Sequence, residues 1–457
     1  MRKAIIGALG SLCFVACGGG DKPDNLFPPK PECNGDAVTA LAGMQPQVIS
    51  KLEIGSAEDG FDLDHDGMPD NKLAAVASLA KSAIDDALSA YEIVIPIEFF
   101  DMPAAAPDEC VKFAIYLGAY VKDADGDTKK PLIDKGDCND TNKDIFPGAA
   151  EVVGDFVDND CDGLADEDAS NNPSTDTADR DADGVTIADG DCDDNNPAVH
   201  KGAVEICGDG LDNDCDGVAD RTVTGTEIAC SPFLPTAEIP LDPLSFSAPG
   251  EPVISFKDGV ISDQGGRLQL DAGPSVFGVN IPVTDGISLD LKISGATIRA
   301  DVTQDGNTIV LKNGHLGGVI DGKTADTIRG LNVDMIGLTP DKSLLDATFA
   351  NVLGPLLALP KAGTKVTDKY AGCRTPDIDV DLDGLEAFCD STPDDTDKSV
   401  DTCIDGNGTE FKDVLDGAGT VIMQCSEALD GDKPRFVDGI SVELNFETTA
   451  VAKIKSP

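Results

Sequence analysis

The residues best suited to chemistry are aspartates that alternate with other residues and are followed by glycine. Asp158–Asp166 reads DNDCDGLAD and Asp212–Asp220 reads DNDCDGVAD. Each stretch has carboxylates at positions one, three, five and nine, and glycine at position six, where the chain must turn sharply. Carboxylates this close repel one another unless a cation lies between them. The spacing therefore predicts sites for a hard divalent cation, and ligands that are all oxygen favour Ca²⁺.

The Asp-x-Asp-x-Asp-Gly spacing also opens the stretches Asp62–Asp70 and Asp379–Asp390, and each stretch has the form of an EF-hand-type loop. Asp62–Asp70 repeats positions one to nine, but Leu73 stands at position twelve, where a complete loop has an acid. Asp379–Asp390 is the most complete loop, because Asp390 occupies position twelve. We expect one Ca²⁺ ion in each loop, held by these sets: Asp62, Asp64, Asp66 and Asp70; Asp158, Asp160, Asp162 and Asp166; Asp212, Asp214, Asp216 and Asp220; Asp379, Asp381, Asp383 and Asp390.

Two of the loops lie in an internal repeat, in which residues 136–166 run parallel to residues 190–220. Cysteines recur at matching places, which predicts the disulfides Cys138–Cys161 and Cys192–Cys215. With so few apolar residues in these segments, disulfides and metal must replace a hydrophobic core. The remaining cysteines pair most economically as Cys207–Cys230, Cys373–Cys389, Cys403–Cys425 and Cys33–Cys110.

The two copies resemble the metal-binding repeat named after a methanotroph surface copper protein, whose pattern includes GDCDD, PGAxExCDG and DNDCDGxxDE. The resemblance implies copper, but copper requires imidazole or sulfur ligands. The copies contain one histidine, His200, and no methionine, so we expect calcium. In the first copy Val153 and Gly154 stand where the family pattern has Cys-Asp, so this copy lacks the cysteine that corresponds to Cys207. The region around residue 380 is also similar to a thrombospondin type 3 calcium repeat.

The N-terminus predicts export. Met1-Arg2-Lys3 is basic, residues 4–16 are small and apolar, and Phe14-Val15-Ala16-Cys17 ends this segment. The pattern is similar to a bacterial lipoprotein signal, which implies a signal peptide 1–16, a lipid on Cys17 and a flexible tether 17–39. The alternative is an ordinary secretory signal. We expect a membrane-anchored protein of the outer membrane or cell surface, with a layout similar to uncharacterised myxobacterial lipoproteins.

Composition excludes several classes of partner. The net charge of −50 is the opposite of what phosphate binding needs, so nucleic acid is not an expected partner. The chain has no Trp and only 4 Tyr, which disfavours carbohydrate binding by aromatic stacking. The 14 cysteines fit an oxidising compartment.

Apolar periodicity predicts an α+β fold, with a mainly antiparallel β domain formed by residues 40–122 and 231–457. The acidic repeats, 123–170 and 171–230, are inserted into it. A helical stripe runs from Leu73 to Leu88, and further helical runs are Ala325–Met335 and Ser343–Leu359. Asp305-Gly306 and Asn313-Gly314 are typical of hairpin turns. Strands are expected near Glu92–Phe100 (an edge strand, because of Pro96), Val111–Val121, Val253–Phe256, Arg267–Leu270, Gly278–Val283, Ile287–Ile293, Ala296–Val302, Thr308–Leu311, Leu316–Ile320 and Ile440–Phe446.

No pattern indicates catalysis. The three histidines, His65, His200 and His315, lie near no plausible nucleophile in the sequence, and no G-x-S-x-G, H-E-x-x-H or phosphate-binding glycine motif occurs. We therefore expect a calcium-stabilised surface protein with a structural or adhesive role. The alternatives are a metal-scavenging surface protein of the copper type and a hydrolase that uses carboxylates.

Overall fold

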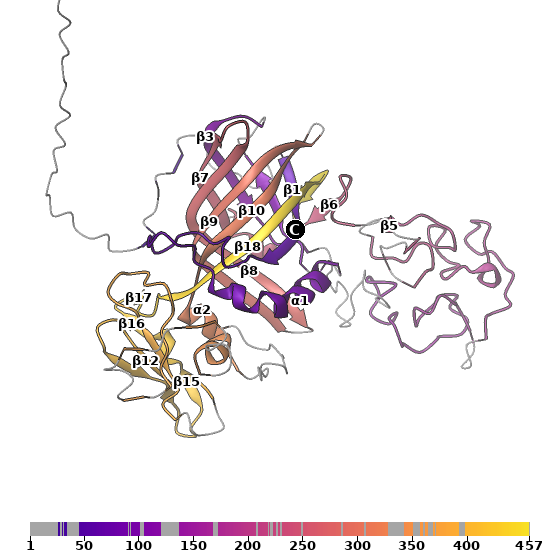
Figure 1. Cartoon of the computed structure of the whole chain (residues 1–457). Helices are drawn as coiled ribbons and strands as arrows, with labels where there is room; N and C mark the ends of the chain where they lie inside the picture. Colours follow the sequence, from indigo (N-terminus) through magenta and orange to yellow (C-terminus); the bar gives the residue numbers. More distant parts are fainter. Residues whose placement is uncertain are drawn as a thin grey trace, which may run out of the picture.

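The computed structural model describes most of the chain between residues 45 and 456 (Figure 1). The predicted signal peptide 1–16, the predicted lipidation site Cys17, and residues Cys207, Asp220 and Cys230 lie outside the described part. The described residues are 26–27, 30, 32–33, 45–89, 91, 93–100, 105–119, 137–167, 172–206, 209–217, 219, 223–224, 227–228, 231–247, 250–284, 287–305, 308–327, 342–350, 357–359, 362–363, 369–370, 372–392 and 398–456.

Eight antiparallel strands close into a barrel, because the last long strand pairs with the first (Figure 1). Strands from both sides of the acidic repeats take part, since β3 pairs with β7. The predicted fold class, mainly antiparallel β with a few helices, is confirmed. Around the barrel the strands are β1 (Gln45–Ile54), β18 (Gly439–Ala450), β10 (Thr308–Asp321), β9 (Ile287–Asp305), β8 (Leu268–Thr284), β7 (Ile254–Asp263), β3 (Asp108–Ile115) and β2 (Pro96–Phe99).

Alternate residues of the strands fill the barrel, as the pleat of a β-strand requires. On β3, Val111, Phe113 and Ile115 belong to the main core cluster. The ring of Phe113 stacks on Phe256 of β7 with centroids 4.8 Å apart, and it also contacts Phe99 of β2 at 5.1 Å. Three neighbouring strands are therefore joined by aromatic packing inside the barrel.

Most strand predictions were right in kind but too short, whereas Glu92–Phe100 and Val111–Val121 were longer than the observed β2 and β3. Thr308–Leu311 and Leu316–Ile320 form one strand, β10, and the predicted turn at Asn313-Gly314 is wrong. Asn313 instead takes a φ of 46°, and the pairing with β9 shifts there, so the pair forms a bulge. Gly314 is needed because a Cβ there would lie 2.6 Å from the ring of Phe446.

Two further strands, β1 and β2, also differ from expectation. Pro96 does not mark an edge, because β2 pairs with both β1 and β3. Proline is tolerated there since it is the first residue of the strand. The strand β1 was not predicted: its sequence QPQVISKLEI contains a proline and a bulge between Ile49 and Lys51, which break simple alternation.

The predicted helix after the first aspartate loop is present, as a 3-10 turn (Lys72–Val76) followed by α1 (Ala77–Ser89). Asn71 begins it but does not cap it with its side chain. Its amide donates to the carbonyls of Gly55 and Ser56, and its Oδ1 accepts from the N–H of Glu443. The side chain therefore fastens the loop to the barrel wall.

Between β10 and β18 the chain forms a smaller, loop-rich region at one end of the barrel (Figure 1). Of the two predicted helical runs, the first overlaps α2 (Gly322–Thr327) and the second a π-helical turn (Asp346–Ala350). Disulfides Cys373–Cys389 and Cys403–Cys425, both expected from the sequence, bind it together. Its strands are β11 (Ala387–Cys389), β12 (Thr402–Ile404), β13 (Glu410–Lys412), β14 (Val414–Leu415), β15 (Val421–Met423), β16 (Leu429–Asp430) and β17 (Lys433–Pro434).

Short strands complete the chain beside the barrel. β6 (Glu238–Pro240) pairs in parallel with the C-terminal β19 (Lys453–Lys455), and β4 (Val223–Thr224) pairs with β5 (Glu227–Ile228). No helix among the described residues has both the length and the apolar character needed to cross a membrane.

Part of the predicted flexible tether packs on the folded protein. Leu26 is buried, and its N–H donates to the carbonyl of Val380 at 2.7 Å. The N–H of Cys33 donates to Lys257 O at 2.7 Å, so both residues contact the folded part of the chain.

The structure does not join Cys33 and Cys110 in the predicted disulfide; the two thiols are neighbours with a hydrogen bond between them. The Cys33 thiol also points to the carbonyl of Gly259, 4.0 Å away. Burial, and then the neighbouring Cys110 thiol, raise the pKa of Cys33 to about 12.

A buried ion pair lies on the outside of the barrel, where the 55–71 loop covers β10 and β18. His315 Nδ1 lies 2.5 Å from Glu443 Oε1, and the Glu443 side chain is fully buried. The hydrogen bond between His315 and Glu443 raises the pKa of His315, and the charge of Asp59 raises it further. Burial and the charge of Arg299 lower it. Burial raises the pKa of Glu443, and the charged imidazole offsets part of that increase.

This pair predicts a pH-dependent contribution to stability. Because the pKa of His315 is higher in the folded state than its ordinary value of 6.5, the stabilisation is complete below about pH 6.5 and is lost as pH rises through the folded pKa. The unfolding free energy measured with denaturant should therefore fall as pH rises through this range. We expect His315→Asn to remove the part of this fall that His315 causes. The exposed His65 offers the control His65→Asn, and equal pH profiles for His315→Asn and the native chain would contradict the prediction.

Candidate metal sites

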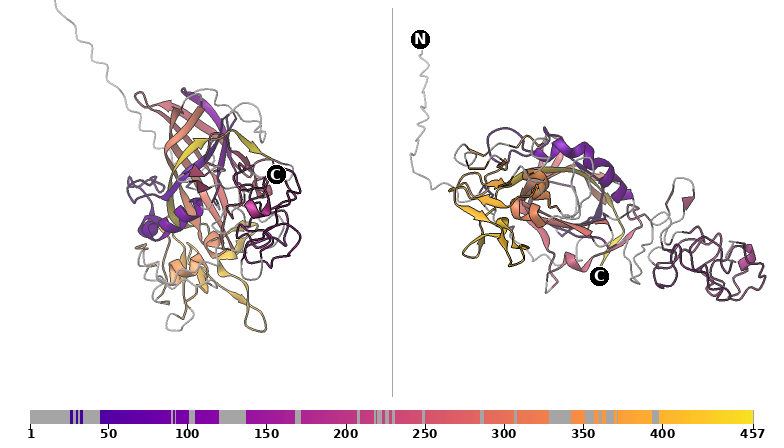
Figure 2. Two further views of the ribbon diagram at one scale, coloured as in Figure 1. Left: turned by 90° about the vertical axis from the view of Figure 1, so that its right-hand side faces the viewer. Right: turned by 90° about the horizontal axis from the view of Figure 1, so that it is seen from below.

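The two acidic repeats form one interlocked unit that stands to the side of the barrel (Figures 1 and 2). Isolated β-bridges join Asn139 to Leu211 and Val157 to Asp193. Because the copies are offset by 54 residues, each bridge is the counterpart of the other, so the pairing has pseudo-two-fold symmetry. Each copy therefore provides the β-bridge partners of the other copy.

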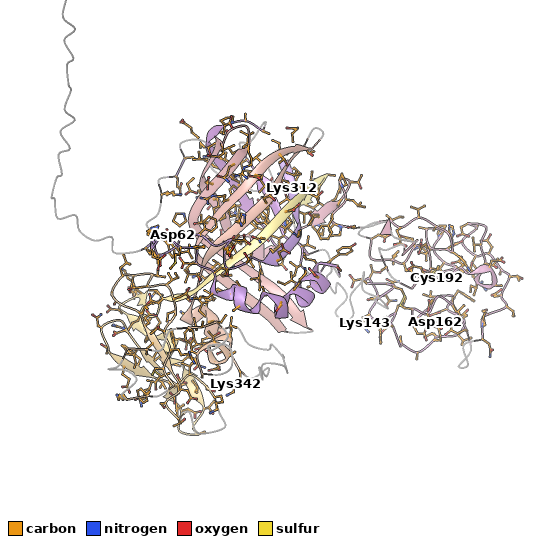
Figure 3. All side chains as sticks on the ribbon, viewed as in Figure 1. Asp62, Lys143, Asp162, Cys192, Lys312 and Lys342 are labelled. Atoms are coloured by element: carbon orange, nitrogen blue, oxygen red, sulfur yellow. A yellow bond between two sulfur atoms is a disulfide. The ribbon has the colours of Figure 1, made fainter. Side chains whose placement is uncertain are left out.

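Disulfides hold each half, as expected from the cysteine spacing. Cys138 joins Cys161 and Cys192 joins Cys215. The small space between the halves is lined by four apolar side chains, by Cys138 and Cys192, and by Asn139, Asp158, Asp193 and Asp212, and its volume of about 20 Å³ is too small for a ligand. This contact therefore replaces the hydrophobic core that the segment lacks, and Figure 3 shows Cys192 and Asp162 within the same compact unit.

All four loops close in the same way. The first aspartate accepts, through one carboxylate oxygen, the backbone N–H of the glycine at position six. The glycines all have positive φ, from 88° at Gly163 to 119° at Gly384, which favours glycine at this place. The N–H···O distances are 3.1 Å for Gly67–Asp62, 2.7 Å for Gly163–Asp158, 2.7 Å for Gly217–Asp212 and 3.1 Å for Gly384–Asp379.

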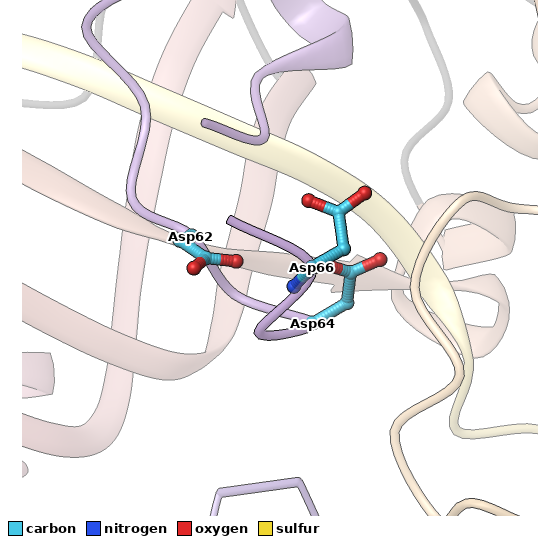
Figure 4. Close-up of side chains that lie close together, drawn as sticks. All are labelled: Asp62, Asp64 and Asp66. Atoms are coloured by element: carbon cyan, nitrogen blue, oxygen red, sulfur yellow. Dashed lines mark hydrogen bonds between the residues drawn. The ribbon is translucent and has the colours of Figure 1, made fainter. Parts of the chain in front are cut away.

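In two loops the first three aspartates come together as predicted. Asp62, Asp64 and Asp66 each offer an oxygen within 4.8 Å of the others, on a single exposed turn (Figure 4). Asp158, Asp160 and Asp162 form an equivalent, more buried group. Ligands bound to Ca²⁺ at about 2.4 Å lie at most about 4.8 Å apart, so both groups fit one such ion.

The later positions have other contacts. At position nine of the first repeat, Asp166 Oδ1 accepts the N–H of Gly154 at 2.5 Å and so closes the preceding turn. Asp70 does the same in its loop, accepting the N–H of Leu63 at 2.7 Å. These two aspartates hold the loop backbone in place. The sequence analysis predicted them only as metal ligands.

The fourth loop, Asp379–Asp390, is joined to the barrel through Glu386 and Asp438, two buried acids. Asp379 has one oxygen buried without a hydrogen-bond partner, and Asp390, at position twelve, accepts the N–H of Thr392 at 3.0 Å. Glu386 accepts the N–H of Asp438 at 3.2 Å, while Asp438 accepts the N–H of Glu386 at 3.0 Å. Burial raises the pKa of both carboxyls, and Asp438 raises that of Glu386 further.

The structure shows a cluster of three carboxylates that the sequence analysis missed. Glu151, Asp160 and Glu167 offer oxygens within 4.8 Å of one another. Glu151 Oε2, Asp160 Oδ1 and Glu167 Oε2 are buried without a hydrogen-bond partner. Glu151 meanwhile uses Oε1 to accept the N–H of Asn159 at 2.6 Å, which orients the carboxylate. The recurrence of glutamate at 151 and 205 in the two copies was the available signal.

A second missed group lies in the other copy. Asp181, Asp183 and Asp191 offer oxygens within 4.8 Å of one another, and the Oδ2 atom of each is buried without a hydrogen-bond partner. Buried carboxylate oxygens are normally hydrogen-bonded, and groups of them without partners indicate a cation. The residues present therefore fit metal cations in both repeats.

Electrostatics support this interpretation. Burial, more than repulsion from neighbouring acids, raises the pKa of Asp158 to about 7 and that of Asp212 to about 6. The same cause raises the pKa of Glu167 and of Asp191 to about 7. A bound cation favours the charged form of each carboxyl and so removes this cost.

Comparison with known proteins agrees with the geometry. The family model Cu-binding_MopE, described as "Putative metal-binding motif", matches residues 137–167 and 191–221. These ranges contain both disulfides and both interlocked loops. The chain therefore carries two metal-binding repeats. No curated protein and no solved structure matches it.

The interlocked backbone predicts that the two loops bind metal cooperatively. Asp158 N donates to Cys192 O at 2.9 Å, and Asp212 N donates to Cys138 O at 3.0 Å. Ordering one loop therefore orders the other. We expect Asp158→Asn, which keeps the acceptor for Gly163, to remove one calcium site and also weaken the other copy's site, measured by calorimetric titration.

The matched control is Asp144→Asn in the same copy, because the Asp144 side chain is 76% exposed. We expect this control to bind calcium like the native chain. If Asp158→Asn loses one site while the remaining affinities stay unchanged, the repeats bind independently and the prediction is wrong.

Proposed function

We propose that this chain is a calcium-stabilised, lipid-anchored protein of the cell envelope or surface, with a structural or adhesive role. The observation that carries the proposal is the shared closure of the four loops, in which aspartate at position one holds the amide of a positive-φ glycine at position six. In two of the loops the oxygens of the first three aspartates also lie within 4.8 Å of one another, and oxygen ligands suit Ca²⁺.

Exported proteins meet abundant calcium, so such sites act as structural ties rather than sensors. The acidic unit stands apart from the barrel, which suits a surface that contacts a partner (Figure 2). Its excess of acids, 29 against 6 bases between residues 123 and 220, favours a cation-mediated or basic contact.

Calorimetric titration of metal-stripped protein with Ca²⁺, Mg²⁺ and Cu²⁺ tests the choice of metal. We expect Ca²⁺ to bind at several sites and to bind more tightly than Mg²⁺, because Mg²⁺ demands a tighter octahedral geometry and gives up its water ligands reluctantly. Cu²⁺ binding at the aspartate loops in preference to Ca²⁺ would overturn the proposal.

The lipid anchor is tested separately. Its support is the basic start, the apolar segment and the Phe14-Val15-Ala16-Cys17 sequence. We expect mass spectrometry of the mature protein to find a lipidated Cys17 at the N-terminus, and Cys17→Ser to abolish membrane association. A mature chain that begins elsewhere without a lipid would show an ordinary secretory signal instead.

A further inference from the structure

The Asp181–Asp183–Asp191 group lies beside the single histidine of the two repeats. Asp181, Asp183 and Asp191 each use Oδ1 to accept a backbone N–H two residues further along the chain, at 3.1, 2.7 and 3.0 Å. Each therefore has Oδ2 directed away from that turn, and all three Oδ2 atoms are buried without a hydrogen-bond partner. Asp191 is 1% exposed and the side chain of Asp183 is 6% exposed.

The ring of His200 is oriented by the backbone. His200 Nδ1 lies 3.3 Å from the carbonyl oxygen of Lys201, and a carbonyl can only accept, so Nδ1 carries the proton. The other ring nitrogen, Nε2, lies 3.8 Å from Asp183 Oδ2. The N–H of His200 also donates to Asn213 O at 2.9 Å, which ties the histidine to the second DNDCDG loop.

A metal ion between Nε2 and the three buried Oδ2 atoms would give these oxygens the partner that they lack. The nearby arginine serves other acids, because Arg180 binds Asp194 at 2.5 Å and Asp176 at 2.5 Å. A histidine whose second ring nitrogen donates to a backbone carbonyl is the usual arrangement of a metal ligand.

We propose that Asp181, Asp183, Asp191 and His200 form a mixed nitrogen–oxygen site for a transition-metal cation of the zinc class. Ligands at about 2.1 Å from such an ion lie at most about 4.2 Å apart, so the His200–Asp183 distance fits. Imidazole nitrogen is a poor ligand for calcium, which makes this site chemically distinct from the aspartate loops. The proposal goes beyond calcium binding and does not depend on it.

The first copy lacks the nitrogen ligand. Phe146 occupies the position that corresponds to His200, and its ring cannot bind a metal. The site therefore belongs to the second copy alone, and one zinc-class ion is expected for each chain.

The test uses the full chain, stripped of metal, saturated with Ca²⁺ and then titrated with Zn²⁺, with Co²⁺ absorption as a spectroscopic readout of nitrogen–oxygen coordination. We expect one Zn²⁺ to bind, and His200→Asn to weaken it by at least about tenfold. Asp183→Asn, which keeps the histidine, gives a second test with the same expected loss. The matched control is His65→Asn, a histidine in another aspartate loop, which should bind Zn²⁺ like the native chain.

Three results would overturn the proposal: unchanged Zn²⁺ affinity in His200→Asn, equal weakening in His65→Asn, or displacement of Zn²⁺ by excess Ca²⁺. A calcium titration of His200→Asn separates this site from the loops, because it should match the native chain. Loss of calcium binding in that variant would also count against the proposal, since the histidine would then act on the fold.

Discussion

Removing calcium should lower the melting temperature of the protein and expose the acidic unit, residues 137–217, to protease before the barrel is cut. The unit has a small interior and is held by two disulfides, and its clustered carboxylates repel one another unless a cation lies between them. At a calcium concentration one hundred times the dissociation constant, each site contributes about 2.7 kcal/mol of unfolding free energy. Loss of several sites is therefore the largest single change expected. Thermal melting and limited proteolysis, with and without chelator, measure it.

The proper control is chelation followed by readdition of Ca²⁺ or of Mg²⁺. We expect Ca²⁺ to restore both the melting temperature and the protease resistance, and Mg²⁺ to restore less, because Mg²⁺ demands a tighter octahedral geometry. An unchanged melting temperature and an unchanged cleavage pattern after thorough chelation would show that the loops need no ion.

Truncating Phe113 to alanine should destabilise the barrel by about 3–5 kcal/mol. Phe113 is fully buried, stacks on Phe256 and contacts Phe99, so its removal leaves a cavity across three strands. Denaturant unfolding followed by circular dichroism measures the loss. Calcium titration of the same variant should still detect the acidic unit, because its disulfides and carboxylate clusters lie outside the barrel core.

An exposed apolar residue supplies the control for this substitution. Ile422, on β15, is 64% exposed, and Ile422→Ala should change the unfolding free energy by less than about 0.5 kcal/mol. If Phe113→Ala costs no more than Ile422→Ala, the aromatic stack does not stabilise the barrel as the packing implies.

Much of the molecule could be predicted because its signals are local. The repeat offset and cysteine spacing placed two disulfides correctly, since residues at matching places in two copies adopt matching structures. The Asp-x-Asp-x-Asp-Gly spacing located turns whose closure involves only six consecutive residues. The alternating apolar strands gave the fold class, because strand period depends on the backbone alone.

What the sequence by itself determined is therefore the set of loops, their chemistry and the antiparallel β character. Only the tertiary structure decided how these parts meet. Closure of the barrel depends on β1 pairing with β18 almost four hundred residues later, and no local pattern encodes such a partner. The same is true of Glu167 joining Glu151 and of His200 meeting Asp183, because chain segments distant in sequence are brought together by the folded backbone rather than by spacing.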